Sequence, residues 1–440
     1  MRLNRTLVTL AAAATLAGGL AQPASAATEI QFWHAFTGPL GEILAKQVEG
    51  FNGSQTDYQV VAVYKGNYSE TLNAGVAAFR ASQQPHILMV FEVGTATMMA
   101  AKGAVNPAYE VMQSGGESFD PSVYLPTVTG YYTDPEGNML SMPYNSSTPV
   151  LYYNKDAFAQ AGLDPDAPPK TWSEFGTALD ALKAAGSACP FTTAWQSWVH
   201  LENLGAWHDV PFATAANGFE GLGAELKFNG PLQVKHIQQM GDWAKDGKFV
   251  YAGRRNEGGA RFRSGECAMF TESSAGYAGV KKEAAFAFGV SNLPYWDDVE
   301  GAPQNTIIGG ASLWVLSGHP EEEYQGAAKF FSYLSRPEVQ AEWHQQTGYL
   351  PITLAAYDLT KEQGFYEENL GTETALIQMT AKAPTENSKG IRLGSFDQIR
   401  TVIDEELEAV WAGTKTAQAA LDSAVERGNV LLRRFERAND

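Results

Sequence analysis

Residues 28–33 read TEIQFW, residues 58–64 read YQVVAVY and residues 87–92 read ILMVFE. Each is a short apolar run typical of a buried strand, and amphipathic helical patterns at 38–51 and 68–81 separate them. The order strand, helix, strand, helix, strand predicts a parallel sheet with right-handed crossovers. We therefore expect an α/β fold, in which ligands bind beyond the carboxyl ends of the strands.

A second structural unit begins with a predicted strand at 148–153. Thr171 and Glu174 have the spacing of a reciprocal capping box, which predicts a helix that starts at Trp172. Helical segments follow, and an apolar strand with two adjacent glycines is expected at 305–316.

The last part of the chain is predicted to be mostly helical. Helices are expected at 321–346, divided at Pro337, and again at 397–436, where apolar residues recur at helical spacing.

Length and charge limit the possible functions. The chain has 440 residues, more than one hydrophobic core usually holds, so we expect two or three compact units. Its formal net charge of -18 repels nucleic-acid backbones and anionic lipid surfaces at long range. Nucleic acid is not an expected partner, whereas a small anion can still bind in a locally positive pocket.

Residues 1–26 have the pattern of a secretory signal peptide. Arg2 and Arg5 precede an apolar stretch at 7–20, and the small residues at 24–26 fit a signal peptidase site. We expect cleavage after this motif and export as an envelope or secreted protein. No cysteine lies at the cleavage site, so a bacterial lipid anchor is not indicated.

The chain has two cysteines, Cys189 and Cys267. In an oxidising compartment such a pair is compatible with one disulfide, and two buried thiols are the alternative. The sequence leaves both possibilities open.

Common motifs for catalysis and metal binding do not fit this sequence. The seven histidines do not form the helical His pair with adjacent Glu that a zinc protease requires, and residues 241–248 lack the glycine spacing and the Ser/Thr of a phosphate-binding loop. Ser312 does not fit the nucleophile elbow of a hydrolase. We expect no catalytic residue, no metal and no cofactor.

Six segments together resemble the periplasmic glycerol-3-phosphate-binding proteins of bacterial ABC importers. They are FWH at 32–34, VYKGNY at 63–68, EVGTATMM at 92–99, NSSTPVLYYNK at 145–155, IIGGASLWV at 307–315 and WHQQTGYLP at 343–351. The two segments nearest the C-terminus are shared with the wider family of extracellular solute-binding proteins, whereas YKGNY, EVGTAT and NSSTP are specific to the glycerol-phosphate branch.

The resemblance implies a type II-like periplasmic binding protein, in which two α/β lobes close on a ligand in the cleft between them. It assigns residues 27–147 to the N-terminal lobe, 148–300 to the C-terminal lobe, 301–346 to the N-terminal lobe again and 347–440 to the C-terminal lobe with its closing helices. It also implies a monomer that delivers its ligand to the transmembrane subunits of an ABC permease and catalyses no reaction.

The ligand implied is sn-glycerol 3-phosphate, with tolerance for glycerophosphodiesters such as glycerophosphocholine. Its phosphate needs charge-assisted donors, and its hydroxyls need polar partners. Carried over position by position, the family's ligand contacts fall on Tyr68, Glu92, Ser147, Trp172, Ser273, Gly310, Tyr349 and Arg400.

Most of these residues also have a plain structural interpretation. The Arg400 guanidinium suits phosphate oxygens, although a surface pair with Asp404 at i, i+4 is the alternative. Ser273 fits both an anion site and an ordinary helix cap. Ser147 offers a hydroxyl, and Gly310 permits either close approach of a ligand or tight strand packing.

The aromatic and acidic candidates are ambiguous as well. Tyr68 and Tyr349 can donate phenol hydrogens to a ligand, but tyrosines in such patterns are often core residues. Glu92 would repel phosphate, so we place it at the glycerol end. Trp172 either covers the ligand or packs at its helix start.

Two other functions stay open at this point. A sugar- or oligosaccharide-binding protein of an ABC importer would use stacking aromatics, which 10 Trp and 18 Tyr allow. A secreted phosphodiesterase or glycosidase belongs to a different class and would have to turn its ligand over.

Overall fold

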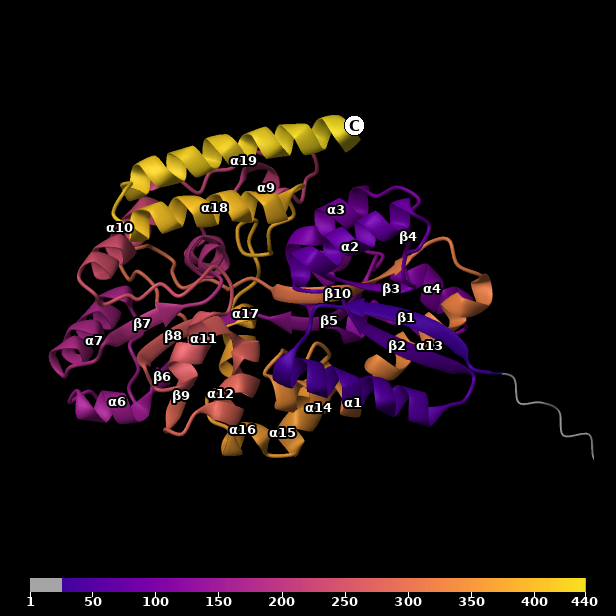
Figure 1. Cartoon of the computed structure of the whole chain (residues 1–440), viewed down its shortest axis with the longest axis horizontal. Coiled ribbons are helices and arrows are strands. Elements are labelled where there is room, and N and C mark those ends of the chain that lie inside the picture. The colour runs from indigo at the N-terminus through magenta and orange to yellow at the C-terminus, as the bar shows by residue number, and fades with distance from the viewer. Residues whose placement is uncertain (1–25, 440) are drawn as a thin grey trace, which may run out of the picture.

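The computed structural model describes residues 26–439 and has two lobes side by side along its long axis, each built around one sheet (Figure 1). Residues 1–25, which carry nearly all of the predicted signal peptide, lie outside the described part. The mixed α/β architecture expected from the alternating pattern is confirmed.

The first sheet has the strand order β2-β1-β3-β10-β4, with β5 also paired to β10. Its strands are β1 (Thr28–His34), β2 (Tyr58–Tyr64), β3 (Ile87–Phe91), β4 (Val105–Asn106), β5 (Met142–Ser147) and β10 (Gly309–Leu316). As predicted, β1 runs parallel to β2 and β3. The sheet is nevertheless mixed, because β10 enters from the other lobe and pairs antiparallel with β3 and β5.

The helices of this lobe pack on the sheet or on one another. They are α1 (Gly38–Ser54), α2 (Tyr68–Arg80), α3 (Thr95–Ala100), α4 (Ala108–Ser114), α5 (Pro126–Tyr132), α13 (Glu321–Leu334), α14 (Pro337–Thr347), α15 (Leu354–Glu362) and α16 (Phe365–Glu368). The start of α2 is fixed by a capping box between Asn67 and Glu70, which satisfies two otherwise free backbone donors. The predicted division between α13 and α14 at Pro337 is confirmed.

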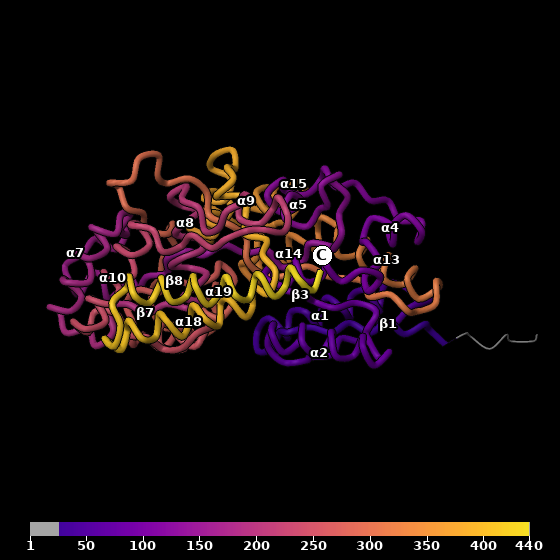
Figure 2. The backbone as a smooth tube through the Cα atoms, turned by 90° about the horizontal axis from the view of Figure 1, so that it is seen from above, coloured from indigo at the N-terminus to yellow at the C-terminus, as the bar shows by residue number. Residues whose placement is uncertain are grey.

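The second sheet has the order β7-β8-β6-β9. These strands are β6 (Pro149–Asn154), β7 (Cys189–Thr193), β8 (Cys267–Ser273) and β9 (Phe288–Ser291). Its helices are α6 (Lys155–Gln160), α7 (Trp172–Ala184), α8 (Asn203–Trp207), α9 (Thr214–Asn217), α10 (Pro231–Lys245), α11 (Gly258–Arg263), α12 (Tyr277–Glu283), α17 (Thr374–Thr380), α18 (Phe396–Trp411) and α19 (Ala417–Asn439). The last two lie alongside each other and pack on α10 (Figures 1 and 2).

The chain passes between the sheets more than once. It leaves the first sheet at Thr148, between β5 and β6, and returns between β9 and β10. It crosses once more in the stretch of sequence between Ile352 and α17. Ile352 still contacts the first lobe, because its carbonyl accepts the N–H of Leu125, whereas α17 packs on β6 of the second sheet. Repeated passages bring the ends of strands from both sheets to the same central region.

Cys189 and Cys267 form a disulfide, which decides between the two alternatives that the sequence left open. They are partners in the parallel pairing of β7 and β8, with their Cα atoms 4.5 Å apart, and both are buried. In the same described part of the chain, no helix combines the length and the hydropathy needed to cross a membrane.

Candidate functional site

A cavity of about 400 Å³ lies between the two lobes. Its wall combines loops after β1, β2 and β3 of the first lobe with residues of β8, α11, α12 and α18 of the second. Seven of the eight residues predicted for the site line it: Tyr68, Glu92, Ser147, Ser273, Gly310, Tyr349 and Arg400. Residues spread over more than 300 positions of sequence thus meet around one cavity.

Gly310 occupies a position that other residues could not adopt without strain. Its φ is +90°, and a Cβ at this position would lie 1.7 Å from the backbone oxygen of Asn145. Close packing of β10 on β5 therefore requires glycine here. The same close packing leaves the backbone of Gly310 exposed to the cavity.

Tyr68 and Tyr349 form an aromatic wall of the cavity. The ring of Tyr68 stacks on Phe91 with centroids 5.3 Å apart, and its hydroxyl accepts a hydrogen bond of 2.9 Å from the Asn145 side chain. Burial raises the pKa of Tyr68 well above its ordinary value and raises the pKa of Tyr349 to about 12. Both side chains remain neutral phenols that can donate to an anion.

Arg400 is held by two carboxylates. Its Nε and Nη2 donate to the two oxygens of Glu202 at 2.7 Å each, and Nη2 also donates to Glu92 at 2.6 Å. All three side chains are buried. The alternative surface pair with Asp404 is not formed, since Asp404 instead accepts a hydrogen bond from Gln196.

The charge of this triad is unbalanced. Burial lowers the pKa of Arg400, but the charges of Glu202 and Glu92 outweigh that effect and raise it, so the guanidinium stays charged. Burial raises the pKa of Glu92, and the charge of Arg400 opposes the increase. Two carboxyl groups therefore share one guanidinium.

The hydroxyls of Ser147 and Ser273 lie near the point where the chain passes between the sheets. Ser273 pairs with Pro149 at the end of β8, and its Oγ accepts the N–H of Ala275, which confirms its predicted role as a cap. Ser147 pairs with Gly309 at the start of β10. These two serines supply hydroxyl groups from different lobes.

Trp172 is not part of the cavity wall, and the prediction that it could contact a ligand is not supported by its position. It is 3% exposed and packs against Phe175 and His236 in the core of the second lobe. The predicted capping box between Thr171 and Glu174 is confirmed, and it directs this first helical side chain inward.

Several residues of the cavity wall carried no recognisable motif. The cavity is also lined by Trp195, Trp198, Arg263 and Glu272. Glu202 does not line it but accepts hydrogen bonds from Arg400. Glu202 closes a π-helical turn of five residues. Only the three-dimensional contact identifies it, because 198 positions separate it from Arg400.

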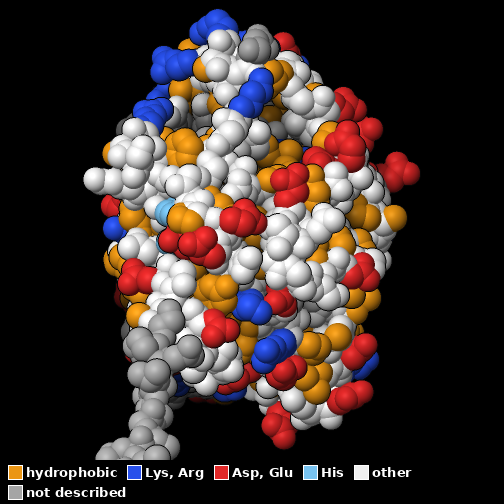
Figure 3. Space-filling model, turned by 90° about the vertical axis from the view of Figure 1, so that its right-hand side faces the viewer, with side chains coloured by type: hydrophobic (Ala, Val, Ile, Leu, Met, Phe, Trp, Pro, Cys, Tyr) orange, Lys and Arg blue, Asp and Glu red, His pale blue; other side chains and the backbone are white. Residues whose placement is uncertain are grey.

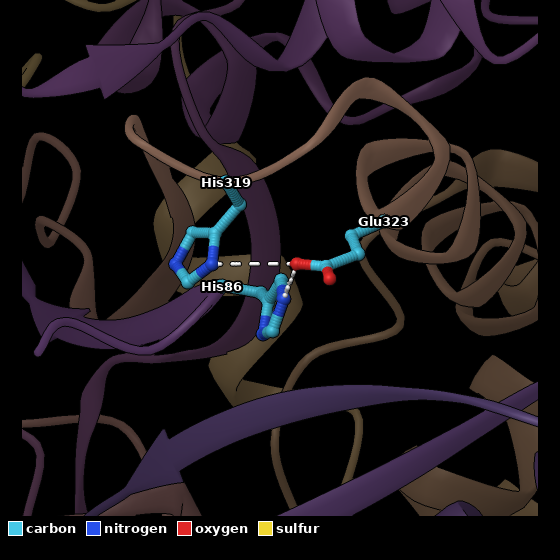
Figure 4. Close-up of side chains that lie close together, drawn as sticks. All are labelled: His86, His319 and Glu323. Atoms are coloured by element: carbon cyan, nitrogen blue, oxygen red, sulfur yellow. Dashed lines mark hydrogen bonds and ion pairs between the residues drawn. The ribbon is translucent and has the colours of Figure 1, made fainter.

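The described residues contain one group of three potential metal ligands, His86, His319 and Glu323, at the ends of β3 and β10 that point away from the cavity (Figure 4). His86 Nδ1 accepts the backbone N–H of Gln31, so its proton is on Nε2, which donates to Glu323 at 2.6 Å. The nitrogen that faces the carboxylate is a donor and offers no lone pair to a metal. The group therefore ties the start of β3 to α13.

Comparison with known proteins agrees with the geometry. The family model of bacterial extracellular solute-binding proteins matches residues 46–370. The sn-glycerol-3-phosphate-binding periplasmic protein UgpB of Yersinia pseudotuberculosis is 56% identical over 417 residues, covering 94% of this chain and 95% of the relative. UgpB of Pectobacterium atrosepticum is 54% identical over 435 residues, covering 99% and 97%.

Solved structures have the same two-lobed fold. UgpB from Mycobacterium tuberculosis in complex with glycerophosphocholine superposes with a TM-score of 0.79 at 23% identity, covering 93% of this chain and 99% of that one. The GacH receptor of Streptomyces glaucescens, solved unliganded and with acarbose, gives 0.77 at 17% identity, with coverages of 93% and 99%. The predicted fold class is thus confirmed, and the protein belongs to the bacterial extracellular solute-binding protein family.

Proposed function

We propose that the protein captures sn-glycerol 3-phosphate, and glycerophosphodiesters such as glycerophosphocholine, and delivers them unaltered to an ABC permease. The observation that carries the proposal is the cavity: seven residues expected to contact this ligand come from both lobes and line one space of about 400 Å³. The names of relatives with more than half of their residues identical support the same ligand.

The charges in the cavity favour one orientation of the ligand. From the sequence we expected Arg400 to bind phosphate, but two of its nitrogens already donate to Glu202 and Glu92. Two carboxyl groups beside the one guanidinium also make this part of the wall unfavourable for a phosphate dianion. We therefore place the glycerol hydroxyls at Glu92 and Arg400.

We place the phosphate against the part of the wall that offers hydroxyl groups. Tyr68, Tyr349, Ser147 and Ser273 offer hydroxyl groups there, and the backbone of Gly310 permits close approach. In this arrangement Glu92 stays at the glycerol end, as the sequence suggested. Arg400 contacts the glycerol hydroxyls and not, as first expected, the phosphate.

We also propose that the protein works in the periplasm as a monomer beside its permease. Its net charge makes binding to nucleic acid or anionic lipid unfavourable. In the view onto the end of the first lobe, Asp and Glu side chains are spread over much of the face, and Lys and Arg side chains lie at the top and in the lower half (Figure 3).

Calorimetry on the mature protein with glycerol 3-phosphate, glycerophosphocholine and maltose tests the proposal. We expect saturable heat with the two phosphates, and at 100 times the dissociation constant a stabilisation of about 2.7 kcal/mol, visible as a higher Tm. Tyr349→Phe should weaken phosphate binding, whereas Tyr109→Phe, whose hydroxyl bonds Glu110 on the surface, should not.

Binding of maltose alone would favour the sugar-binding alternative, which Trp195 and Trp198 in the cavity wall make physically reasonable. Consumption of either phosphate compound during incubation would contradict delivery without turnover.

A further inference from the structure

Glu272 places a carboxyl group in the cavity wall at the end where the phosphate is proposed to bind. It is 4% exposed and lies on β8, directly before Ser273. Its Oε1 accepts the backbone N–H of Ser273 at 2.7 Å. An ionised carboxylate at this point would repel the phosphate, so its protonation state decides whether the cavity accepts the ligand.

The surroundings of Glu272 do not supply a dedicated cation. Arg263 on α11 is the positive group that acts on it, but the Nε of Arg263 donates to Glu283 at 2.7 Å. Glu257 adds a second negative charge, and the phenols of Tyr152 on β6 and Tyr349 face it as neutral groups. Burial of a carboxylate without a paired cation is costly, which favours the neutral acid.

The titration of Glu272 agrees with this geometry. Burial raises its pKa to about 8, and the Ser273 N–H, Arg263 and the Trp195 side chain only partly oppose the increase. At neutral pH the side chain is therefore mainly a carboxylic acid with one O–H donor.

We propose that Glu272 is a ligand-binding residue whose acid form donates a hydrogen bond to the phosphate, so that the protein binds phosphate esters only while this proton is present. The inference rests on the proposed function and adds a residue and a proton requirement to it. An O–H donor to an anionic oxygen forms a short, charge-assisted hydrogen bond, whereas a carboxylate has nothing to donate.

Diesters and monoesters differ in what they demand of Glu272. A diester such as glycerophosphocholine has no ionisable proton on its phosphate near neutral pH, so the shared proton must come from the protein. A monoester can carry a proton of its own, since its second pKa is about 6. The dependence on Glu272 should consequently be seen most cleanly with the diester.

Calorimetry with glycerophosphocholine from pH 6 to 9.5, in two buffers of different ionisation enthalpy, tests the inference. We expect affinity to be nearly constant at pH 6–7 and to fall about tenfold per pH unit above the ionisation of Glu272 near pH 8, with uptake of one proton. Glu272→Gln retains an N–H donor, so it should bind within about threefold of wild type at pH 7 and lose the pH dependence.

Two further variants complete the design. Glu272→Ala should bind about tenfold more weakly at pH 7, because it removes the donor. Glu266→Gln changes an exposed carboxylate that pairs with Arg261 in the same lobe, and it should keep the wild-type pH profile.

The outcomes separate this inference from the proposed function. Absence of heat with wild-type protein at every pH would reject the function itself. Wild-type binding that is independent of pH, or a Glu272→Gln variant that keeps the wild-type slope, would overturn the role of Glu272 and leave the function standing. If Glu272→Gln does not fold, the proton uptake of wild type and the profile of Glu272→Ala decide.

Discussion

Glu202 accepts two hydrogen bonds of 2.7 Å from Arg400, one from Nε and one from Nη2, although 198 positions of sequence separate the two residues. The pair fixes the guanidinium plane before any ligand arrives. Glu92, from the first lobe, takes a further hydrogen bond of Nη2, so the triad also joins the two lobes through buried charge. Ligand binding and lobe contact therefore depend on the same group.

Arg400→Ala should destabilise the protein as well as weaken ligand binding. This variant leaves Glu92 and Glu202 buried without a counter-charge. Loss of one partner of a buried pair costs about 3–5 kcal/mol. Urea unfolding at pH 7 measures the change.

The double variant Arg400→Met with Glu202→Gln is the matched control. It removes one uncompensated charge together with the arginine, so it should recover about 1–2 kcal/mol of the lost stability while ligand binding stays impaired. Equal stability of the single and double variants would mean that the triad contributes little to folding.

Local patterns predicted much of the fold. The strand at 58–64 was predicted to the residue, because its apolar run is bounded by polar turns, and the capping box at Thr171 fixed the start of α7. The direction of β10 was not predicted, since it depends on how the chain returns from the other lobe.

The residues of the candidate site also differ in how far the sequence could predict them. Gly310 and Ser273 belong to short motifs that can be read from neighbouring residues. The pairing of Arg400 with Glu202 and the burial of Glu272 arise only when distant segments pack together, and no local spacing encodes them. The sequence left open whether Trp172 covers a ligand or packs at its helix start, because an aromatic residue at that position gives no sign of which side it faces; in the structure it packs in the second lobe.

Gly310→Ala should disrupt the cavity. A methyl group at φ +90° would meet the Asn145 carbonyl oxygen, which β5 holds in place, so strain and a shift of β10 are both expected. We expect a loss of more than about 1 kcal/mol in the free energy of unfolding and at least tenfold weaker ligand binding.

Gly162→Ala is a useful comparison, because Gly162 also has a positive φ, +72°, but has open space around it. It should cost about 1–2 kcal/mol and leave ligand affinity unchanged. If both variants bind ligand as wild type does, close approach at Gly310 is not required for the site.

Removal of the disulfide should affect stability far more than binding. The bond closes a loop with a sequence separation of 78, for which the chain-entropy model gives about 4 kcal/mol. Neither Cys189 nor Cys267 lines the cavity. The variant with both cysteines changed to Ala should unfold at a lower urea concentration than oxidised wild type. Wild type treated with reductant should unfold at a similarly low concentration. The variant should keep the ligand affinity of wild type.

Acid should destabilise the protein through its buried histidines. Burial lowers the pKa of His200 to about 3 and the pKa of His208 and His344 to about 4, so each stays neutral in the fold. Between pH 6.5 and about 4 the unfolded chain binds these protons and the folded chain does not. Each group therefore gives full stability above pH 6.5 and loses about 1.4 kcal/mol per unit as pH falls through that window.

Two acids oppose this trend, since burial raises the pKa of Glu272 to about 8 and of Asp404 to about 7, and both stabilise the fold as pH falls from these values towards the ordinary range of carboxyl groups. Burial also lowers the pKa of His34, His86 and His236, and it raises the pKa of Glu92. Six histidines against three carboxyl groups predict a net loss of stability in urea unfolding between pH 6.5 and 4.5. His344→Gln keeps a polar side chain between the Tyr349 carbonyl and the Tyr366 hydroxyl and removes one titration, so its curve should be flatter. A stability that rises steadily as pH falls from 6.5 to 4.5 would show that the carboxyl groups dominate the acid response.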